Sequence, residues 1–405
     1  MGLMKPRGKN YVTWLECSAT GERYPFAEIR QVSDAGKPLL VRYDLERVAR
    51  EVPRQMVSER PADMWRYREL LPLADFEGRS TLGESMTPLV PLAKLAPEPG
   101  RVWIKDDSRL PTGSFKARGL AVAVSRAREL GVSKLAMSSN GNAGVALAAY
   151  AARVGLEAIV FCPQDTPTVF LEEMRAYGAQ VRLIPGLIHE CTREVVAGQM
   201  RGAWYDVCTL REPYRIEGKK TIGLEIAEQC QWHLPDVIFY PTGGGTGLIG
   251  MWKAFQELRH IGWVSCPLPR LVAVQAAGCA PLVHAYATGQ EHADPWPRAQ
   301  TIAWGIRVPQ ALGDFLILRA VRATAGFALA VSDEQILQAQ KELATVEGLW
   351  ICPEGAATWA AYRLALERRL ISASDRVVLF NGACATKYLP TSSTAAIASV
   401  STGTD

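Results

Sequence analysis

The sequence predicts an α/β protein whose main body consists of mostly parallel β-sheets covered by helices. Short apolar runs alternate with longer segments of helical spacing from about residue 86 to residue 380. Polar or glycine-rich turns follow several of these runs, as is typical of the ends of parallel strands. The 405 residues are enough for two or three domains or lobes with a large core.

The predicted elements follow one another closely along the chain. In the first half they are a strand at 102–104, a helix at 115–130, a strand at 134–137, a helix at 144–154, a strand at 158–161, a helix at 169–177 and a strand at 180–184. In the second half they are a helix at 217–230, a strand at 236–240, a helix at 248–258, a strand at 271–275, helices at 333–347 and 355–367, and a strand at 376–380.

Both ends of the chain differ from this main body. Residues 1–85 are expected to form an N-terminal extension, irregular from residue 11 onward, that packs on a catalytic region at 86–390. The last segment, 391–405, is rich in Ser, Thr and Ala and has little apolar mass, so a disordered tail is predicted.

Composition excludes several classes of protein. The net charge of +4 is spread along the chain, which argues against nucleic-acid binding. No apolar run reaches the roughly 18 residues of a membrane span. The nine cysteines are dispersed and include no C-x-x-C pair, which predicts reduced thiols in a cytoplasmic protein and no metal site.

A lysine at the predicted start of a helix is the first candidate for chemistry. Lys116 follows a turn with Pro111 and Gly113 in segment 111–119. A helix start and partial burial both favour the neutral amine over the ammonium ion, and the neutral amine is the form that reacts with carbonyl groups. Most lysines near helix starts are simply exposed to solvent. Lys116 is therefore a candidate only in combination with the other turns.

Two further turns can hold anionic groups. Segment 138–144 places hydroxyl, amide and backbone N–H groups at the start of a predicted helix, where they could bind a carboxylate or simply cap the helix. Segment 242–247 follows a buried strand and precedes a helix, which is typical of a phosphate site. Its candidate residues are Gly243, Gly244, Gly245, Thr246 and Gly247.

A dinucleotide site is the competing interpretation of the glycine-rich segment. Residues 245–250 fit the pattern G-x-G-x-x-G. That fingerprint also requires an acidic residue at the end of the next strand, which binds the ribose. Here the strand ends at Gln275 with no acidic residue beside it. The pattern alone therefore gives weak support for NAD.

Together these segments resemble the threonine synthases, in the tryptophan synthase β-like group (fold type II) of enzymes that use pyridoxal 5′-phosphate (PLP). The resemblance covers about residues 11–388, including segments 215–218 and 353–357. It implies that Lys116 binds PLP as a Schiff base, that Asn142 meets the 3-hydroxyl group and that 243–247 hold the phosphate. It also implies two three-layer α/β/α lobes with mostly parallel sheets, the smaller at about 130–215.

The chain departs from the family pattern at two places. The family has a Thr that meets the pyridine nitrogen after its last strand, and Gly382 stands there in this sequence. Cys384 or Thr386 is therefore expected to take that role. At the N-terminus many relatives have a cysteine-paired zinc ribbon, of which Cys17 is a single remaining cysteine, so a metal-free ribbon-like segment is expected.

The resemblance implies a lyase that converts O-phosphohomoserine and water to threonine and phosphate. The turn with Ser138, Ser139, Asn140 and Gly141 would hold the substrate carboxylate, and Ser114, Lys105 and Thr87 are candidates for the substrate phosphate. The alternatives are a serine/threonine dehydratase, a cysteate-synthase-like β-replacement enzyme, or a PLP-binding regulatory protein without catalysis. Because relatives are often dimers, a homodimer is expected.

Overall fold

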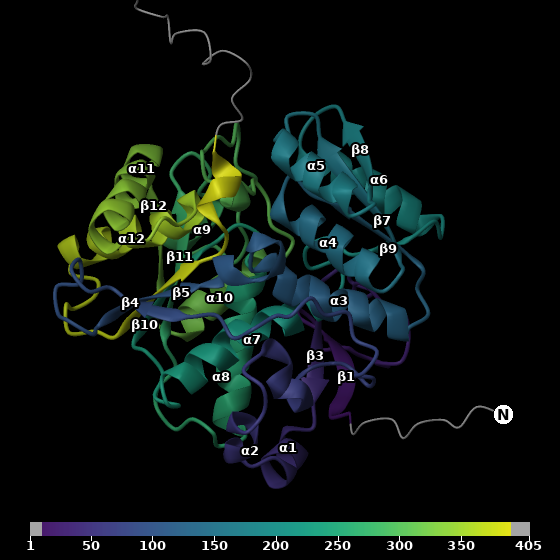
Figure 1. Ribbon diagram of the computed structural model, residues 1–405, viewed down its shortest axis with the longest axis horizontal. Helices are drawn as coiled ribbons and strands as arrows, with labels where there is room; N and C mark the ends of the chain where they lie inside the picture. The colour runs from purple at the N-terminus through teal and green to yellow at the C-terminus, as the bar shows by residue number, and fades with distance from the viewer. Residues whose placement is uncertain (1–9, 390–405) are drawn as a thin grey trace, which may run out of the picture.

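The computed structural model describes residues 10–389. These residues form three β-sheets. Figure 1 shows a four-stranded sheet and a six-stranded sheet on opposite sides of a central pair of helices, with a small N-terminal sheet below them. The predicted α/β fold with mostly parallel sheets is confirmed. The predicted tail at 391–405 lies outside the described residues.

The four-stranded sheet is entirely parallel, with the order β8-β7-β6-β9. Its strands are β6 (Lys134–Ser138), β7 (Glu157–Pro163), β8 (Gln180–Ile184) and β9 (Tyr205–Asp206). The helices of this part are α4 (Asn142–Arg153), α5 (Thr168–Ala176) and α6 (Ile188–Met200). These elements lie within residues 130–215, and we propose that this range forms the smaller lobe.

The six-stranded sheet has the order β12-β11-β10-β13-β5-β4. Its strands are β4 (Leu89–Pro91), β5 (Val102–Asp106), β10 (Val237–Pro241), β11 (Arg270–Ala276), β12 (Phe327–Val331) and β13 (Val377–Asn381). All neighbours are parallel except β4 and β5. Its accompanying helices are α8 (Thr246–His260), α9 (Pro281–Ala287), α10 (Asp314–Ala323), α11 (Asp333–Glu342) and α12 (Pro353–Glu367).

Helices α3 (Lys116–Glu129) and α7 (Tyr214–Gln229) pack against each other between the two large sheets (Figure 1). Every residue of α7 from Tyr214 to Ala227 is buried, including its lysines and glutamates. A helix buried on all faces has no polar stripe, and its charged residues must find partners inside the protein. These two helices carry the ion pairs that underlie the site described below.

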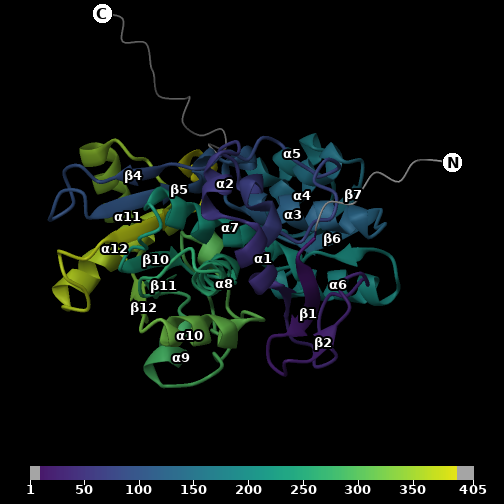
Figure 2. The same cartoon turned by 90° about the horizontal axis from the view of Figure 1, so that it is seen from below.

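The N-terminal extension is more regular than the sequence prediction of an irregular segment. Strands β1 (Val12–Cys17), β2 (Arg23–Tyr24) and β3 (Leu39–Tyr43) form an antiparallel sheet in the order β2-β1-β3. Helices α1 (Leu45–Glu51) and α2 (Arg54–Ser58) and a 3-10 segment, η1 (Met64–Leu70), follow. Figure 2 shows β1 and β2 at the lower edge of the molecule, to the right of α9 and α10. Short strands separated by polar turns give too weak a periodic pattern to be recognised.

The described residues contain no helix that is long and apolar enough to cross a membrane. Within residues 10–389 no group of three or more His, Cys, Asp and Glu side chains is arranged to hold a metal ion. All nine cysteines lie in the described part and have free thiols.

Candidate active site

Lys116 is the first residue of α3, and its amine lies in an electrostatically unusual position. The side chain keeps part of its surface accessible, and its nitrogen lies 4.0 Å from the centroid of the Phe115 ring. Burial and then the neighbouring Arg215 guanidinium lower the pKa of Lys116 to about 7, against a smaller opposing effect of Glu354. A large fraction of this amine is therefore uncharged at neutral pH, as a nucleophilic lysine requires.

The loop before Lys116 is tied to the end of strand β13. Phe115 N donates to Gly382 O at 2.8 Å, and Cys384 N donates to Gly113 O at 2.9 Å. Thr112 adopts a left-handed conformation with φ of 60° and ψ of 17°, which is strained for a residue other than glycine. The hydroxyl groups of Thr112 and Ser114 are buried and have no hydrogen-bond partner in the described structure. These two hydroxyls are available to a ligand beside the lysine.

A second lysine, Lys219, supports the same turn. Its amine donates to the carbonyl oxygen of Phe115 and lies 3.8 Å from the centroid of the Phe115 ring. Burial and the proximity of Lys116 and Arg215 lower the pKa of Lys219 well below its usual value. Lys219 therefore fixes the peptide that precedes Lys116 without adding a full charge to the pocket.

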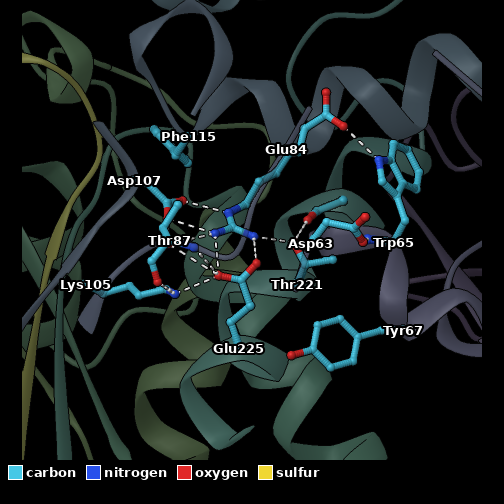
Figure 3. A network of polar contacts seen from close by, with 12 residues as sticks. Asp63, Trp65, Tyr67, Glu84, Thr87, Lys105, Asp107, Phe115, Thr221 and Glu225 are labelled. Atoms are coloured by element: carbon cyan, nitrogen blue, oxygen red, sulfur yellow. Dashed lines mark hydrogen bonds and ion pairs between the residues drawn. The ribbon is translucent and has the colours of Figure 1, made fainter. Parts of the chain in front are cut away.

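A buried network of charges lies beneath the start of α3 (Figure 3). The Arg118 guanidinium forms ion pairs with Asp107 at 2.8 Å and with Glu225 at 2.6 Å. Lys105 donates to Glu225 at 2.7 Å and to the carbonyl oxygen of Thr87 at 2.8 Å. These four charged side chains have no exposed surface, and two cations balance two carboxylates. The network joins β5, α3 and α7, so it fixes the backbone from which Lys116 projects.

This network accounts for two residues that the sequence suggested as phosphate ligands. The Lys105 amine also donates to Gln229 Oε1 at 2.9 Å, so three acceptors surround it. Thr87 Oγ1 donates to Asp107 Oδ1 at 2.7 Å and accepts a hydrogen bond from Arg118. Neither side chain has a free donor for a ligand, and their positions argue against that suggested role. Ser114 is the suggested residue whose hydroxyl stays free.

The turn before α4 has the properties of an anion site. Ser139 Oγ accepts hydrogen bonds from Gly141 N and Gly144 N, and Ser138 Oγ contacts Thr192 Oγ1 at 2.8 Å. Both serines therefore shape the turn, which also contains the half-buried Asn140. At Asn142, the first helical residue, Nδ2 donates to the Tyr388 hydroxyl at 3.3 Å, while Oδ1 is buried without a partner. The first backbone N–H groups of a helix also lack intrahelical partners.

The glycine-rich turn between β10 and α8 leaves no room for side chains. A Cβ atom added to Gly243 would lie 2.9 Å from Val308 Cγ2, and one added to Gly244 would lie 2.8 Å from Thr209 Cγ2. Gly245 has φ of 72° and a Cβ there would overlap Ile317, whereas one at Gly247 would overlap the Tyr240 hydroxyl. Thr246 begins α8. A close-fitting turn of backbone N–H groups at a helix start is suited to a phosphate.

Side-chain contacts connect these turns. Tyr240, at the end of β10 before the glycine-rich turn, packs against Phe115 with ring centroids 6.3 Å apart. Gly305, whose carbonyl lies beside Gly243, donates its N–H to Glu354 Oε1 at 2.6 Å. The charge of Glu354 acts on both Lys116 and Tyr388, and Tyr388 bonds Asn142. The lysine, the amide and the glycine-rich turn are thus linked by a continuous chain of contacts and electrostatic effects.

The two residues expected to meet a pyridine nitrogen are paired with each other. Cys384 Sγ lies 2.9 Å from Thr386 Oγ1, and Thr386 is exposed. Gly382 is buried, and a Cβ atom there would lie 3.0 Å from Phe115 Cδ1. The role predicted for Cys384 and Thr386 therefore stays a prediction, with a competing candidate considered below.

The site matches the parts of a phosphorylated aromatic aldehyde. An uncharged amine suits its carbonyl group, the unpartnered Oδ1 of Asn142 suits its hydroxyl group, and the turn of glycines suits its phosphate. Arg215 adds a buried guanidinium whose Nε has no hydrogen-bond partner in the described residues. The residues present therefore fit PLP.

Comparison with known proteins agrees with this fit. Residues 80–382 match the family model described as "Pyridoxal-phosphate dependent enzyme". The chain belongs to the pyridoxal-phosphate-dependent enzyme family, and PLP is its cofactor. The same match favours PLP over NAD, the competing interpretation of the glycine-rich segment.

Two curated relatives share most of their length with this chain. The threonine synthase of Methanocaldococcus jannaschii is 34% identical over 365 residues, which cover 89% of this chain and 90% of the relative. The threonine synthase of Methanosarcina acetivorans is 33% identical over 375 residues, which cover 90% and 89% respectively. The predicted membership of a threonine-synthase-like family of PLP enzymes is thereby confirmed.

Solved structures confirm the predicted type II fold. Maize serine racemase aligns with a TM-score of 0.63 and 23% identity, over 74% of this chain and 88% of that chain. Threonine deaminase isoform 2 of Solanum lycopersicum aligns with a TM-score of 0.62 and 22% identity, over 74% and 79%. At this level of identity the likeness concerns the fold.

Three residues with roles in the site were not singled out from the sequence. Glu354 and Arg215 belong to segments that carried the family resemblance, but no role followed from their spacing. Tyr388 was recognised only as part of the last turn. What distinguishes Glu354 and Arg215 is a buried polar atom without a partner, which the local sequence does not reveal.

Proposed function

We propose that this chain is a threonine synthase, a PLP-dependent lyase that converts O-phosphohomoserine and water to threonine and phosphate. The observation that carries the proposal is the buried guanidinium of Arg215. It is 1% exposed, its Nη1 donates to Val207 O at 2.7 Å, and its Nε has no partner among the described residues. Glu212 and Asp206 lie within electrostatic range, but among the described residues no carboxylate forms a salt bridge with this guanidinium, so it is suited to bind an anionic ligand.

A substrate with two anionic groups would use both sides of the site. The start of α4, with segment 138–141, is the proposed site for the α-carboxylate. Arg215, with the unpartnered hydroxyls of Thr112 and Ser114, is the proposed site for the γ-phosphate. Two fixed anion sites would orient the carbon chain between them, which favours reaction at one defined bond.

Lys116 is the proposed base. PLP, when bound, supplies an electron-withdrawing ring that stabilises negative charge on the substrate's α-carbon. An amine with a pKa of about 7 can accept a proton from carbon and release it again at neutral pH. Tyr388 and Phe170, whose rings meet edge to face with centroids 6.4 Å apart, are proposed to limit the entry of water to the site.

A second function is favoured by the altered end of β13. Gly382 has no side chain to meet the pyridine nitrogen, and the identity of that partner affects how strongly the ring withdraws electrons. A serine/threonine dehydratase or a β-replacement enzyme is therefore the alternative. Both alternatives would use Lys116 and the glycine-rich turn in the same way.

The test compares products from defined substrates. The PLP-loaded protein is incubated with O-phosphohomoserine, and separately with threonine and with serine, while phosphate, threonine and keto acids are measured. Threonine with equimolar phosphate supports the proposal, whereas keto acid alone supports the dehydratase. Lys116→Ala should abolish turnover and the visible absorbance of bound PLP, whereas the exposed control Lys94→Ala should change neither.

Absence of turnover with PLP still bound would instead indicate a binding or regulatory protein. We also propose that the enzyme is a homodimer. Light scattering of the purified protein gives the mass directly, and a monomer at micromolar concentration would contradict this part of the proposal.

A further inference from the structure

Glu354 is a buried carboxyl group with one unused oxygen. The residue is 5% exposed, and its Oε1 accepts a hydrogen bond from Gly305 N at 2.6 Å. Its Oε2 is buried and has no hydrogen-bond partner in the described structure. No salt bridge to Glu354 occurs within residues 10–389 that would neutralise it. Since buried polar atoms are normally satisfied, the free oxygen indicates a missing partner.

The position of Glu354 places this oxygen at the end of the last strand. Glu354 lies in the first turn of α12, where the helix dipole favours a negative charge. The next residue, Gly355, packs against Asn381, the last residue of β13, and Ile351 pairs with Cys384. Glu354 is therefore adjacent to the turn in which Gly382 leaves a ring nitrogen without a side-chain partner.

Glu354 and Lys116 interact electrostatically but form no salt bridge in the described structure. The carboxyl group raises the pKa of Lys116 against the larger effect of burial, so the two groups lie within electrostatic range. Oε2 has no partner with hydrogen-bond geometry among the described residues, although the Tyr388 hydroxyl and the Cys352 thiol lie close enough to Glu354 for its charge to raise their pKa values. On the opposite side, the bond to Gly305 connects Glu354 to the wall of the glycine-rich turn. Glu354 therefore connects the surroundings of Lys116 with the glycine-rich turn.

The other candidates for the ring nitrogen are less well placed. Cys384 and Thr386 contact each other, and Thr386 is exposed to solvent. Cys352 Sγ already donates to Asn381 Oδ1 at 3.1 Å. Tyr388 accepts a hydrogen bond from Asn142. Only Glu354, in this set, combines burial with a polar atom that lacks a partner.

We propose that Glu354 Oε2 accepts a hydrogen bond from the protonated pyridine nitrogen of the cofactor, in place of the side chain absent at Gly382. This inference rests on PLP as the cofactor but not on threonine as the product. A carboxylate, unlike a hydroxyl group, retains a proton on the ring nitrogen at neutral pH through a charge-assisted bond. The ring then withdraws electrons more strongly, which affects the range of bonds that the enzyme can break.

The experiment measures the protonation of the ring nitrogen directly. The full chain is loaded with PLP labelled with ¹⁵N in the ring, and its ¹⁵N chemical shift is recorded near neutral pH. We expect the protonated shift in the unaltered protein and the unprotonated shift in Glu354→Gln. The affinity for PLP should fall about ten- to a hundred-fold, as expected when a charge-assisted hydrogen bond is lost.

Controls separate the outcomes. Glu334→Gln alters an exposed glutamate in the first turn of α11 and should leave the shift unchanged. An unprotonated nitrogen in the unaltered protein overturns the inference without any variant, so a misfolded Glu354→Gln does not prevent the test. A change of shift in Cys384→Ala but not in Glu354→Gln also overturns it. Failure of the unaltered chain to bind PLP would instead contradict the cofactor assignment.

Discussion

At the scale of single residues, the lysine amine is controlled by burial and by two charged neighbours that come from distant parts of the sequence. Arg215 lowers the pKa of Lys116, and Glu354 raises it by a smaller amount, while burial has the largest effect. The pKa of Lys219 is lowered for similar reasons, so it does not add a competing charge. The reactivity of Lys116 is therefore a property of its tertiary surroundings.

The pH dependence of cofactor attachment should report this environment. We expect the rate at which the cofactor-free protein takes up PLP on Lys116 to rise with pH, with a midpoint near 7 rather than near the usual lysine pKa of 10.5. Arg215→Gln removes a positive charge and should raise the midpoint. Stopped-flow absorbance from mildly acidic to mildly alkaline pH measures both.

The exposed Arg201 provides the control, because Arg201→Gln should leave the midpoint unchanged. The linked effect on folding has a definite sign. Because the pKa of the free amine is lower in the folded than in the unfolded chain, the cofactor-free protein should lose stability as pH falls from about 10 toward 7. A midpoint above 9 in the unaltered protein would contradict the assigned environment.

At the scale of elements, helix α5 and the 3-10 turn η6 (Ala385–Tyr388) are in contact through side chains. Lys387 forms an ion pair with Glu173 of α5 at 2.7 Å and also donates to Thr112 O at 2.7 Å. Phe170 of the same helix packs against Tyr388. The proposed smaller lobe is therefore connected to the final turn and to the strained loop before Lys116.

Reversal of this ion pair should affect substrate binding. Glu173→Lys and Lys387→Glu each place like charges together, and each should raise the KM for the amino-acid substrate by up to about fivefold, the scale of a partly exposed ion pair. The double variant restores the attraction and should recover part of the loss. Steady-state kinetics on the unaltered protein and the three variants gives the coupling energy between Glu173 and Lys387. If the effects of the two single substitutions on KM simply add in the double variant, the ion pair does not contribute to substrate binding.

At the scale of the whole molecule, the N-terminal extension is bonded to the catalytic region at several separate points. Tyr43 donates to Glu217 Oε2 of α7 at 2.7 Å, Gln31 donates to Asp206 O at 2.5 Å, and Arg319 donates to Ser18 O at 3.0 Å. Its apolar residues also belong to the large core cluster shared with α3, α7 and the four-stranded sheet. The extension is thus part of the folded body.

Tyr43→Phe should show this integration as a loss of stability. The variant removes a donor from the buried Glu217, which also pairs with Lys220 and Lys253, and should lower the free energy of unfolding by about 1–3 kcal/mol. Urea unfolding measures the change, and Tyr177→Phe at an exposed position is the control. PLP affinity should be unaffected, because Tyr43 does not contact the site residues. An unchanged midpoint would mean that the extension contributes little to the fold.

Local patterns in the sequence predicted most of the catalytic region. The strand at 180–184 coincides with β8, and the helix predicted at 169–177 is shifted by one residue from α5. The helix predicted at 333–347 has α-helical form only to Glu342, after which a wider π-helical turn leads to Gly348 in a left-handed conformation. Strand β12 (Phe327–Val331) was not predicted, because an apolar run this short does not by itself distinguish a strand from a buried part of a helix.

The residues of the candidate site also fall into two groups: those that a local sequence pattern marks and those whose surroundings depend on the fold. The lysine at a helix start and the glycine-rich turn are local features, so the sequence could suggest them. The suggestion that Lys105 binds a substrate phosphate was not supported. The local sequence did not reveal that this lysine is buried within a network of ion pairs. Arg215 and Glu354 acquire their roles from unpaired atoms in a folded interior, which no spacing of residues encodes.

The four buried charges below α3 also restrict how this sequence can change over time. Loss of any one of Lys105, Asp107, Arg118 or Glu225 would leave an uncompensated charge inside the protein, at a cost of about 3–5 kcal/mol, whereas joint replacement by apolar residues is often tolerated. Single-step substitution would therefore pass through poorly folded intermediates. In a collection of related sequences, these four positions should vary as a group or not at all.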